Sequence, residues 1–405
     1  MSVIGRPVKY FPPFNNLRVI KTLTDFPTAV SGVITLEDDV AYLIDGDVNI
    51  GANRIVCGDN NAIIGHSPEI SFLHNTLASA AMITGIQTLN CFDISFYVSG
   101  AGATILDLDA ATSPDTNNAI DWRNVNFSGG DIGTIKDYSN VIMNTIGIID
   151  KTDEGLPALG DGFTFDGTIG SVVFTDSIFT ASGSGNTAVT LAATLTLTRR
   201  FRASDCAFVI TSSAVGIDHV TGVTIDPEGL ILRDCNFAGG ATYLVGVDYT
   251  NDDARFEGCR GITNTYAAGY ATMIGNSTVT TISTSSTPVK IAGATTNSNL
   301  TQKFTHTSNR LTYTGALSRL CKITAIVTLS SGNNRQIGVY IAKNGTVIDE
   351  SETYLTTNSG GRLENGTCQT VSQVTTDDYF EVWVENNTDT NNVTVEDLSL
   401  SIVDV

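Results

Sequence analysis

The chain has 405 residues, so its length predicts two or more hydrophobic cores. Charged residues make up only 16%, hydrophobic residues 41%, and glycine occurs 38 times, a composition typical of strands and turns and not of helices or a disordered chain. The net charge of −20 would repel phosphate backbones, and no apolar run approaches the length of a membrane span. We therefore expect neither a nucleic-acid partner nor membrane insertion.

The first 16 residues show no periodicity. They contain three prolines and three aromatic residues, Pro7, Pro12, Pro13, Tyr10, Phe11 and Phe14. Proline fixes φ and removes a backbone donor, so residues 1–16 are predicted to form an extended arm. Its aromatic side chains have no local core, which favours attachment of the arm to another protein. The alternative interpretation is that the arm caps the domain that follows it.

An internal repeat runs through residues 17–270, in which Asp or Asn is followed three positions later by Phe inside a strand-like segment. Its copies are Asp93 with Phe96, Asn124 with Phe127, Asp176 with Phe179, Asp205 with Phe208, and Asp234 with Phe237. Successive phenylalanines lie 31, 52, 29 and 29 residues apart, and the gap of 52 predicts a degenerate copy near Asn144. Cys206 and Cys235 keep the 29-residue phase, and Cys259 is expected to continue it.

Repeats of this length predict a parallel β-solenoid, a right-handed β-helix, because each coil must return equivalent positions to the same place in the stack. The phenylalanines should then form a ladder in the interior. Asp and Asn suit the corners, because their side chains bond nearby backbone and the residues tolerate left-handed conformations.

The pattern changes after the repeat. Residues 271–299 are rich in Ser and Thr and are predicted to contain the last strand or two and a neck. From 300 to 405 the strands are longer and alternate apolar with polar residues, as in CKITAIVTLS and DYFEVWVEN, and Lys343-Asn344-Gly345 has the composition of a hairpin turn. This pattern predicts a β-sandwich of the jelly-roll kind.

Two groups of segments carry a resemblance. IAKNGT, DYFEVWVEN and VEDLSLSIV, within residues 300–405, resemble the jelly-roll heads, similar to tumour necrosis factor and complement C1q, that close many phage fibre and spike proteins. Upstream, GVITLEDDVAYLI, NAIDWRNVNFSG, GTIKDYSN and TFDGTIG resemble β-helical virion proteins of phages that infect aquatic bacteria. The resemblance implies a tailed-phage virion protein, and a homotrimer because such jelly rolls are trimeric.

From the resemblance we expect a structural virion protein of a bacteriophage, a trimeric fibre or spike on the tail or the head that takes part in attachment to the host surface. The expected partners are further copies of the chain, tail or capsid proteins that bind the N-terminal arm, and a glycan or protein of the host surface. The alternatives are a polysaccharide-depolymerising tail spike and a capsid decoration or cement protein. No signal-peptide pattern opens the sequence, so assembly in the host cytoplasm is expected, with seven cysteines as buried thiols.

Polysaccharide cleavage requires two carboxylates at a defined separation. The candidate pairs are Asp205 with Asp234, Asp45 with Asp47, and Asp161 with Asp166. Corner and turn geometry explains all three pairs without catalysis. The two tryptophans, Trp122 and Trp383, lie in strand patterns that favour a core or interface position over a sugar platform. We therefore expect no catalytic residue and no enzymatic activity.

No metal or cofactor pattern is evident. The four histidines are neither spaced at i, i+4 nor adjacent to a cysteine, and they are His66, His74, His219 and His306. Asp252 and Asp253 are candidate calcium ligands, although a solvated turn explains them equally. GxGxxG, Walker A and GxSxG motifs are absent from the sequence. We therefore expect no bound metal and no cofactor.

Overall fold

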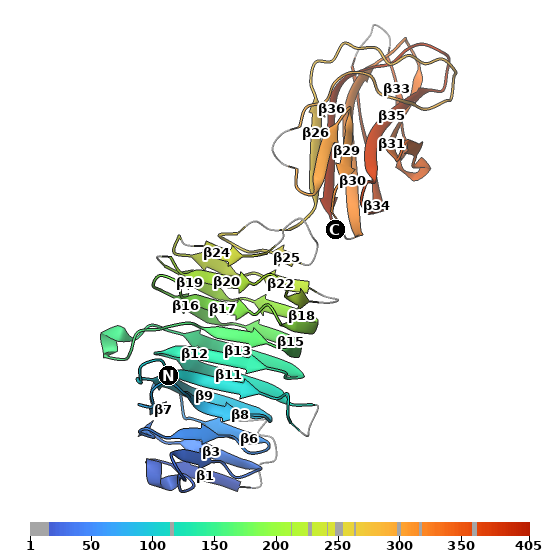
Figure 1. The fold of residues 1–405 in the computed structure, drawn as a ribbon. Helices are drawn as coiled ribbons and strands as arrows, with labels where there is room; N and C mark the ends of the chain where they lie inside the picture. Colours follow the sequence, from blue (N-terminus) through green and yellow to red (C-terminus); the bar gives the residue numbers. More distant parts are fainter. Residues whose placement is uncertain are drawn as a thin grey trace, which may run out of the picture. The chain divides into compact units, whose positions relative to one another are not determined.

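The computed structural model describes residues 16–113, 117–211, 213–225, 229–240, 242–247, 254–262, 265–297, 301–315, 318–358 and 363–405. The chain divides into two compact units, with Thr265 to Val405 belonging to the second (Figure 1). Each unit has its own hydrophobic core. No helix of the described residues is long and apolar enough to cross a membrane. The predicted arm, apart from Asn16, lies outside the described residues.

The first unit is a parallel β-solenoid built on two long sheets (Figure 1). One sheet runs in the order β1 (Asn16–Ile20), β3 (Val40–Ile44), β6 (Asn61–Ile64), β9 (Leu89–Val98), β11 (Ala119–Phe127), β13 (Asn140–Ile148), β15 (Thr168–Thr175), β18 (Thr196–Ser204), β22 (Gly229–Arg233), β25 (Ala254–Glu257). The other runs in the order β2 (Val33–Thr35), β5 (Arg54–Val56), β8 (Ala81–Gly85), β10 (Thr104–Asp109), β12 (Asp131–Lys136), β14 (Phe163–Asp166), β17 (Thr187–Leu191), β20 (Val215–His219), β24 (Thr242–Val245).

Shorter elements complete the coils. The first sheet is extended by β4 (Asp47–Asn49), β7 (Phe72–Asn75), β16 (Ile178–Ala181), β19 (Ala207–Ile210), β21 (Thr224–Ile225) and β23 (Asn236–Ala238). Two 3₁₀ turns are η1 (Leu23–Asp25) and η2 (Thr152–Glu154). The strand pairs of both sheets are parallel, so the expectation of an all-β solenoid is confirmed.

The repeated phenylalanines form the predicted interior ladder. The rings of Phe179 and Phe208 are stacked with their centroids 4.7 Å apart, and those of Phe208 and Phe237 with their centroids 4.6 Å apart. In the degenerate coil the register places Ile148 between Phe127 and Phe179. Apolar side chains at this position are therefore stacked from coil to coil, and they contribute to one continuous core.

The polar residues of the repeat occupy corners, as predicted. The backbone is left-handed at all five, with φ between 49° and 56°: Asp93, Asn124, Asp176, Asp205 and Asp234. In the degenerate coil the left-handed residue is Thr145, one position after the predicted Asn144. Asp and Asn tolerate this conformation better than most residues because their side chains bond the local backbone.

All seven cysteines are buried and none forms a disulfide. Cys206, Cys235 and Cys259 lie on successive coils, where the backbone N–H groups that follow them link the coils, as Asn236 N–H does to the Cys206 carbonyl at 2.8 Å. Burial alone raises the pKa of the Cys57 thiol to about 12. These thiols therefore act as small apolar core groups.

The second unit consists of two antiparallel sheets that enclose a single core (Figure 1). One has the order β26 (Ala268–Met273), β36 (Thr394–Asp404), β30 (Arg319–Ser330), β34 (Glu364–Val374). The other has the order β28 (Phe304–Thr307), β29 (Arg310–Tyr313), β35 (Tyr379–Asn386), β31 (Gln336–Lys343), β32 (Thr346–Val347), with β27 (Val289–Lys290) on β35 and β33 (Thr353–Thr356) on β31. A third 3₁₀ turn is η3 (Asp349–Ser351). The Asn344-Gly345 turn has positive φ at both residues, 55° and 76°, as a two-residue hairpin requires.

The sequence predicts a solenoid to residue 270, a neck over 271–299 and a sandwich from 300, whereas in the structure the second unit includes Thr265 to Val405. β26 pairs with β36 along its whole length, and β27 pairs with β35, so much of the predicted neck 271–299 belongs to the sandwich. Ala271, Met273 and Ile282 are buried in the sandwich core. The Ser and Thr residues that suggested a neck include Thr272, which alternates with these core positions along β26.

Candidate functional site

Three neighbouring strands near the start of the solenoid carry polar and aromatic side chains on their outer face. β4, β7 and β9 pair in parallel, and His74 lies directly beside Tyr97. Because alternate residues of a strand point to opposite faces, Leu73 is buried in the core while Phe72 and His74 point outward. We call this group the outer cluster: Asp45, Asp47, His66, Phe72, His74 and Tyr97.

His74 is the most enclosed member of the outer cluster. Its Nε2 lies 2.9 Å from Asp47 Oδ1, and its ring is stacked on Tyr97 with the centroids 4.2 Å apart. Burial lowers the pKa of His74 below its ordinary 6.5, although the Asp47 carboxylate opposes that shift. At neutral pH the imidazole is therefore uncharged, and its Nε2–H donates to the Asp47 carboxylate.

Asp45 contacts the other histidine of the outer cluster, His66. His66 Nε2 lies 3.4 Å from Asp45 Oδ1, and Lys21 Nζ lies 3.3 Å from Asp45 Oδ2. Asp45 and Asp47 flank Gly46, whose φ of 103° is available mainly to glycine. The chain thus presents two carboxylates at one turn, each in contact with an imidazole from the next coil.

The aromatic members supply an apolar surface beside these carboxylates. Phe72 and Tyr97 meet edge to face with their centroids 6.4 Å apart, and Lys151 Nζ lies 5.9 Å from the centroid of the Phe72 ring. Burial, together with the charge of Asp47, raises the pKa of Tyr97 to about 12, so its hydroxyl remains a donor at neutral pH. Carboxylates beside aromatic rings are groups that can bind sugar hydroxyls and the apolar faces of sugar rings.

The sequence pointed to Asp45 and Asp47 but missed His66 and His74. The histidines lie 21 and 27 residues after their carboxylate partners, so no local motif joins them. The coil length was the signal that could have found them, because residues about one coil apart become neighbours in a solenoid.

The other carboxylate pairs serve turns and corners. Asp161 Oδ1 accepts the Thr187 N–H at 2.9 Å, and Asp166 Oδ1 accepts the Gly167 N–H at 2.7 Å. Asp205 and Asp234 are the exposed corner residues described above. We find no arrangement of these four carboxylates that favours chemistry over local structure.

The tryptophans and the remaining histidines lie elsewhere. Trp122 is fully buried and donates from Nε1 to the Leu89 carbonyl at 3.1 Å, whereas the partly buried Trp383 donates to Glu381 Oε2 at 3.1 Å. His306 lies 2.6 Å from Thr295 Oγ1. Within the described ranges no three His, Cys, Asp or Glu side chains are grouped to hold a metal ion. The calcium candidates Asp252 and Asp253 lie outside those ranges.

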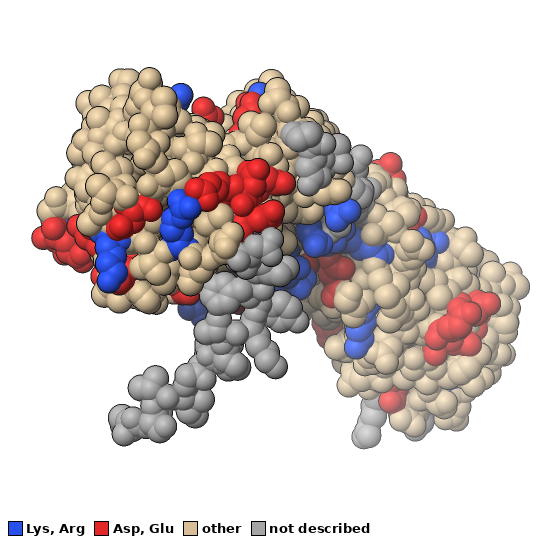
Figure 2. All heavy atoms as spheres, turned by 90° about the horizontal axis from the view of Figure 1, so that it is seen from below, with Lys and Arg blue, Asp and Glu red and all other residues tan. Residues whose placement is uncertain are grey.

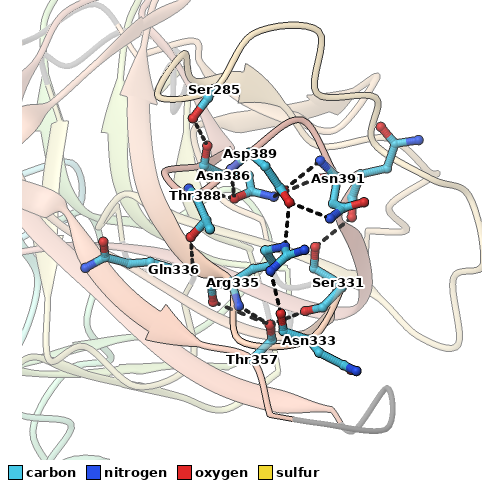
Figure 3. A network of polar contacts seen from close by, with 12 residues as sticks. Ser285, Ser331, Asn333, Arg335, Gln336, Thr357, Asn386, Thr388, Asp389 and Asn391 are labelled. Atoms are coloured by element: carbon cyan, nitrogen blue, oxygen red, sulfur yellow. Dashed lines mark hydrogen bonds and ion pairs between the residues drawn. The ribbon is translucent and has the colours of Figure 1, made fainter.

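A polar network ties loops of the sandwich together (Figure 3). Asn386 is fully buried, and its Nδ2 donates to Asp389 Oδ1 at 2.8 Å and to the Asn391 carbonyl at 2.9 Å. Its Oδ1 accepts the Thr388 N–H at 2.9 Å, while Arg335 Nε lies 2.7 Å from Asp389 Oδ2. Because the Asn386 amide is satisfied at both its nitrogen and its oxygen, we assign the network a structural role in fixing the loop before β36.

No protein-family model matches the chain, and no curated protein matches it. Among similar solved structures, Eiger TNF from S. frugiperda is 9% identical with a TM-score of 0.24, and the match covers 34% of this chain and 93% of that one. The enzymatically active domain of tailspike protein 4 of bacteriophage CBA120 is 8% identical with a TM-score of 0.25, covering 93% and 69%. The tailspike protein of Acinetobacter phage vB_ApiP_P1 is 11% identical with a TM-score of 0.29, covering 90% and 81%. At these TM-scores the likeness is distant, and it assigns no function to the chain.

The expectation that the chain has no enzymatic activity is corrected by this comparison. One of the similar structures is an enzymatically active tailspike domain, so absence of activity is not a property that we assign. The expectation relied on the lack of a recognisable motif. Asp45, Asp47, His66 and His74 come together only when the coils stack, so a motif search does not detect them.

Proposed function

We propose that the chain is a virion protein of a tailed bacteriophage, a spike or fibre that is displayed on the particle and takes part in attachment to the host surface. The observation that carries this proposal is the solenoid itself, whose main hydrophobic core extends from Ile20 to Cys259. Stacked coils of this kind form a stiff support that exposes long side faces for binding. The chain adds a separate sandwich with its own core to that support.

The strand order supports a jelly roll for the sandwich. β26, β36, β30 and β34 form one sheet, and β29, β35, β31 and β33 are successive neighbours in the other. The chain crosses between the two sheets several times, with β26, β30, β34 and β36 in one sheet and the strands between them in the other, as in jelly rolls. We propose that this head sets the oligomeric state, as the resemblance to trimeric heads of the tumour necrosis factor and C1q type implies.

One face of the sandwich is suited to contact with further copies of the chain. The outer side of the sheet β26-β36-β30-β34 exposes Ile326, Val371 and Val403 at 50%, 55% and 47%. Their neighbours on the same face are mainly Ser, Thr and Gln, with Lys322 and Asp397 as oppositely charged exceptions. In a chain with a net charge of −20, a nearly neutral face of this kind favours association between copies, and three copies complete the proposed spike.

We propose that the N-terminal segment attaches the protein to the particle. Residues 1–16 bind tail or capsid proteins in this proposal, and the solenoid and the head face the host. Sedimentation of the full chain should give a homotrimer, and protease-treated, washed particles should retain the protein. A monomer at micromolar concentration, or a protein that washes off the particles, would count against the assignment. A large symmetric copy number would favour a capsid decoration protein.

A second function, cleavage of a surface polysaccharide, is favoured by the outer cluster. Asp45 and Asp47 supply two carboxylates at one turn, which is the minimum that glycoside hydrolysis requires. His74, held neutral by burial, fixes the orientation of Asp47, and Phe72 with Tyr97 borders the turn. Purified host-surface polysaccharide should release reducing or unsaturated ends, and Asp45→Asn or Asp47→Asn should abolish the release. Asp161→Asn, in a structural turn, is the matched control and should leave it unchanged.

A further inference from the structure

Three strands late in the solenoid reverse the charge of the protein locally. β18, β22 and β25 contain five arginines and one acidic residue, Arg199, Arg200, Arg202, Arg233, Arg255 and Glu257. The whole chain has 22 Lys and Arg against 42 Asp and Glu. Figure 2 shows acidic side chains gathered in patches on the face drawn, with Lys and Arg side chains beside several of them.

Most of these arginines share one outer face. Arg200 and Arg202 are two residues apart on β18, so their side chains leave the same side of the sheet. The register pairs Arg202 with Ile231 and Ile231 with Arg255, which places Arg255 two strands beyond Arg202 on that side. Neighbouring strands are about 4.8 Å apart, so the two backbone positions are separated by about 10 Å. We call the surface formed by Arg200, Arg202, Arg233 and Arg255 the arginine face.

The charge of the arginine face is only partly neutralised. Arg233 pairs with Glu257 at 2.7 Å. Arg202 donates from Nε to the Ser204 hydroxyl at 2.8 Å, which orients the guanidinium and leaves its charge in place. Arg255 is exposed. The face therefore offers positive charge to a ligand at intervals along the solenoid.

A polar groove of about 360 Å³ adjoins the arginine face. It is lined by hydroxyl, amide, carboxylate and guanidinium groups, among them those of Asn140, Thr168, Thr198, Arg199 and Asp137. Side chains of these types form hydrogen bonds with hydroxyl-rich ligands, whereas a hydrophobic ligand would find little apolar contact.

The groove lies at an irregularity of the coil. The pairing of β15 with β18 shifts register between Ile169 and Ser171, so that Thr198 and Arg199 together face Gly170. A Cβ on Gly170 would lie only 1.9 Å from the Ser139 carbonyl oxygen, so no side chain fits there. β-Bulges re-aim side chains and are enriched next to functional sites. Here the bulge brings Arg199 to the groove while Arg200 stays on the arginine face.

We infer that the groove and the arginine face together bind an anionic glycan, an oligosaccharide whose sugars carry carboxylate, sulfate or phosphate groups. Sugar hydroxyls bond the groove, and guanidinium groups pair with the acidic substituents, a geometry for which arginine is well suited. The distance between the Arg202 and Arg255 positions is comparable to the length of a disaccharide unit. Acidic groups on alternate sugars can therefore pair with arginines on alternate coils. The inference deepens the proposed attachment function by naming the chemical class of the ligand.

Duplex DNA is the competing polyanion. It carries a charge every ~1.7 Å along its axis and needs several phosphate contacts for binding at physiological salt. The arginine face has few guanidinium groups, and the net charge of −20 opposes a long polyanion. A short oligosaccharide avoids that repulsion because it covers only the groove and the face.

Isothermal titration calorimetry of the full-length protein tests the inference with four probes. Oligogalacturonate and sulfated dextran oligomers represent carboxylate and sulfate sugars, neutral dextran oligomers lack the charge, and a short DNA duplex is the competing polyanion. At least one acidic oligomer should bind, with an affinity that falls as salt rises, and neutral dextran should bind at least about tenfold more weakly. Equal binding of the neutral oligomer, or tighter binding of the duplex than of either acidic oligomer, would overturn the inference.

Variants locate the site. The affinity for the acidic oligomer should fall by about tenfold or more in two variants. One is the double variant Arg202→Ser with Arg255→Ser, and the other is Arg199→Ser. Arg123→Ser is the matched control, because Arg123 lies on an earlier strand of the same sheet and pairs with Asp121, and it should change the affinity less than twofold. Unchanged thermal unfolding shows that the variants fold. Equal affinity in all variants refutes the site, whereas the presence of the protein on particles tests the proposed function independently.

Discussion

The rings of Phe208 and Phe237 lie parallel, one coil apart, with their centroids 4.6 Å apart and their planes 5° from each other. Both side chains are buried, Phe208 completely and Phe237 to within 3% exposure. The stack shows how a side chain repeated every 29 residues becomes a continuous column. Much of the stability of the solenoid should therefore depend on such columns.

Truncation within this column should be costly. Phe208→Ala removes a buried ring between two stacked neighbours, and the cavity should lower the free energy of unfolding by about 3–5 kcal/mol. Val209→Ala is the control, because Val209 is 37% exposed on the same strand and should cost less than about 1 kcal/mol. Denaturant unfolding of both variants measures the difference. Equal midpoints would show that the ladder does not stabilise the fold.

At the Asp205 corner, the effect of a substitution on stability should depend on whether the new residue can adopt a left-handed backbone. Its φ of 56° is left-handed, so Asp205→Val should destabilise the protein by about 1–2 kcal/mol or more, since β-branched residues disfavour this conformation. Asp205→Gly should be tolerated within about 0.5 kcal/mol because glycine adopts positive φ readily. Thermal unfolding of the pair checks the order. If glycine proved as harmful as valine, the carboxylate and not the backbone would be responsible.

The protonation of His74 should report on the outer cluster. Burial lowers its pKa, so an NMR titration of the full chain should give a midpoint below 6.5, and Asp47→Asn should lower it further by removing the opposing charge. The unfolded chain binds this proton more readily than the folded one. The contribution of His74 to stability is therefore fully present above pH of about 6.5 and decreases as the pH falls through the lowered value.

Asp161→Asn is the control for that titration, because Asp161 serves a different turn and should leave the His74 midpoint unchanged. A His74 midpoint above 6.5, or one that rises in Asp47→Asn, would mean that the imidazole is charged in the folded protein. The hydrogen bond from a neutral His74 to Asp47 would then be wrong.

The sandwich should associate only when β26 is included. A fragment of residues 265–405 retains the pairing of β26 with β36 and should sediment as a trimer, whereas residues 300–405 lack that strand and leave the edge of β36 unpaired. Ile326→Lys should convert the longer fragment to a monomer by placing a charge on the neutral face. A monomeric 265–405 fragment at micromolar concentration would contradict the proposed role of the head.

Local and periodic features were accessible from the sequence. The D/N-x-x-F repeat gave both the interior position of Phe208 and the left-handed corner at Asp205, because in a solenoid a fixed period has one spatial meaning. Features that depend on pairing between distant parts of the chain could not be predicted from the sequence. Ala268 pairs with Val403 at the far end of the chain, so nothing local distinguished β26 from a solenoid strand.

The outer cluster shows the same limit within the solenoid. Asp45 and Asp47 could be named as candidates, but coil length varies, so the sequence does not fix which later residues lie beside them. His66 reaches Asp45 through the pairing of β3 with β6, and His74 reaches Asp47 through the pairing of β4 with β7. The same holds for Arg202 and Arg255, which become neighbours on one face through β22.

Quantitative mass spectrometry of purified, washed virions, with the major capsid protein as the internal count, shows whether the chain is a spike or fibre of a phage particle. We expect the chain to be present in a copy number divisible by three, and virions assembled with a chain lacking residues 1–15 to lose it although the shortened protein still folds. Absence of the chain from intact virions, or its retention in full number without residues 1–15, would refute the proposed spike or fibre.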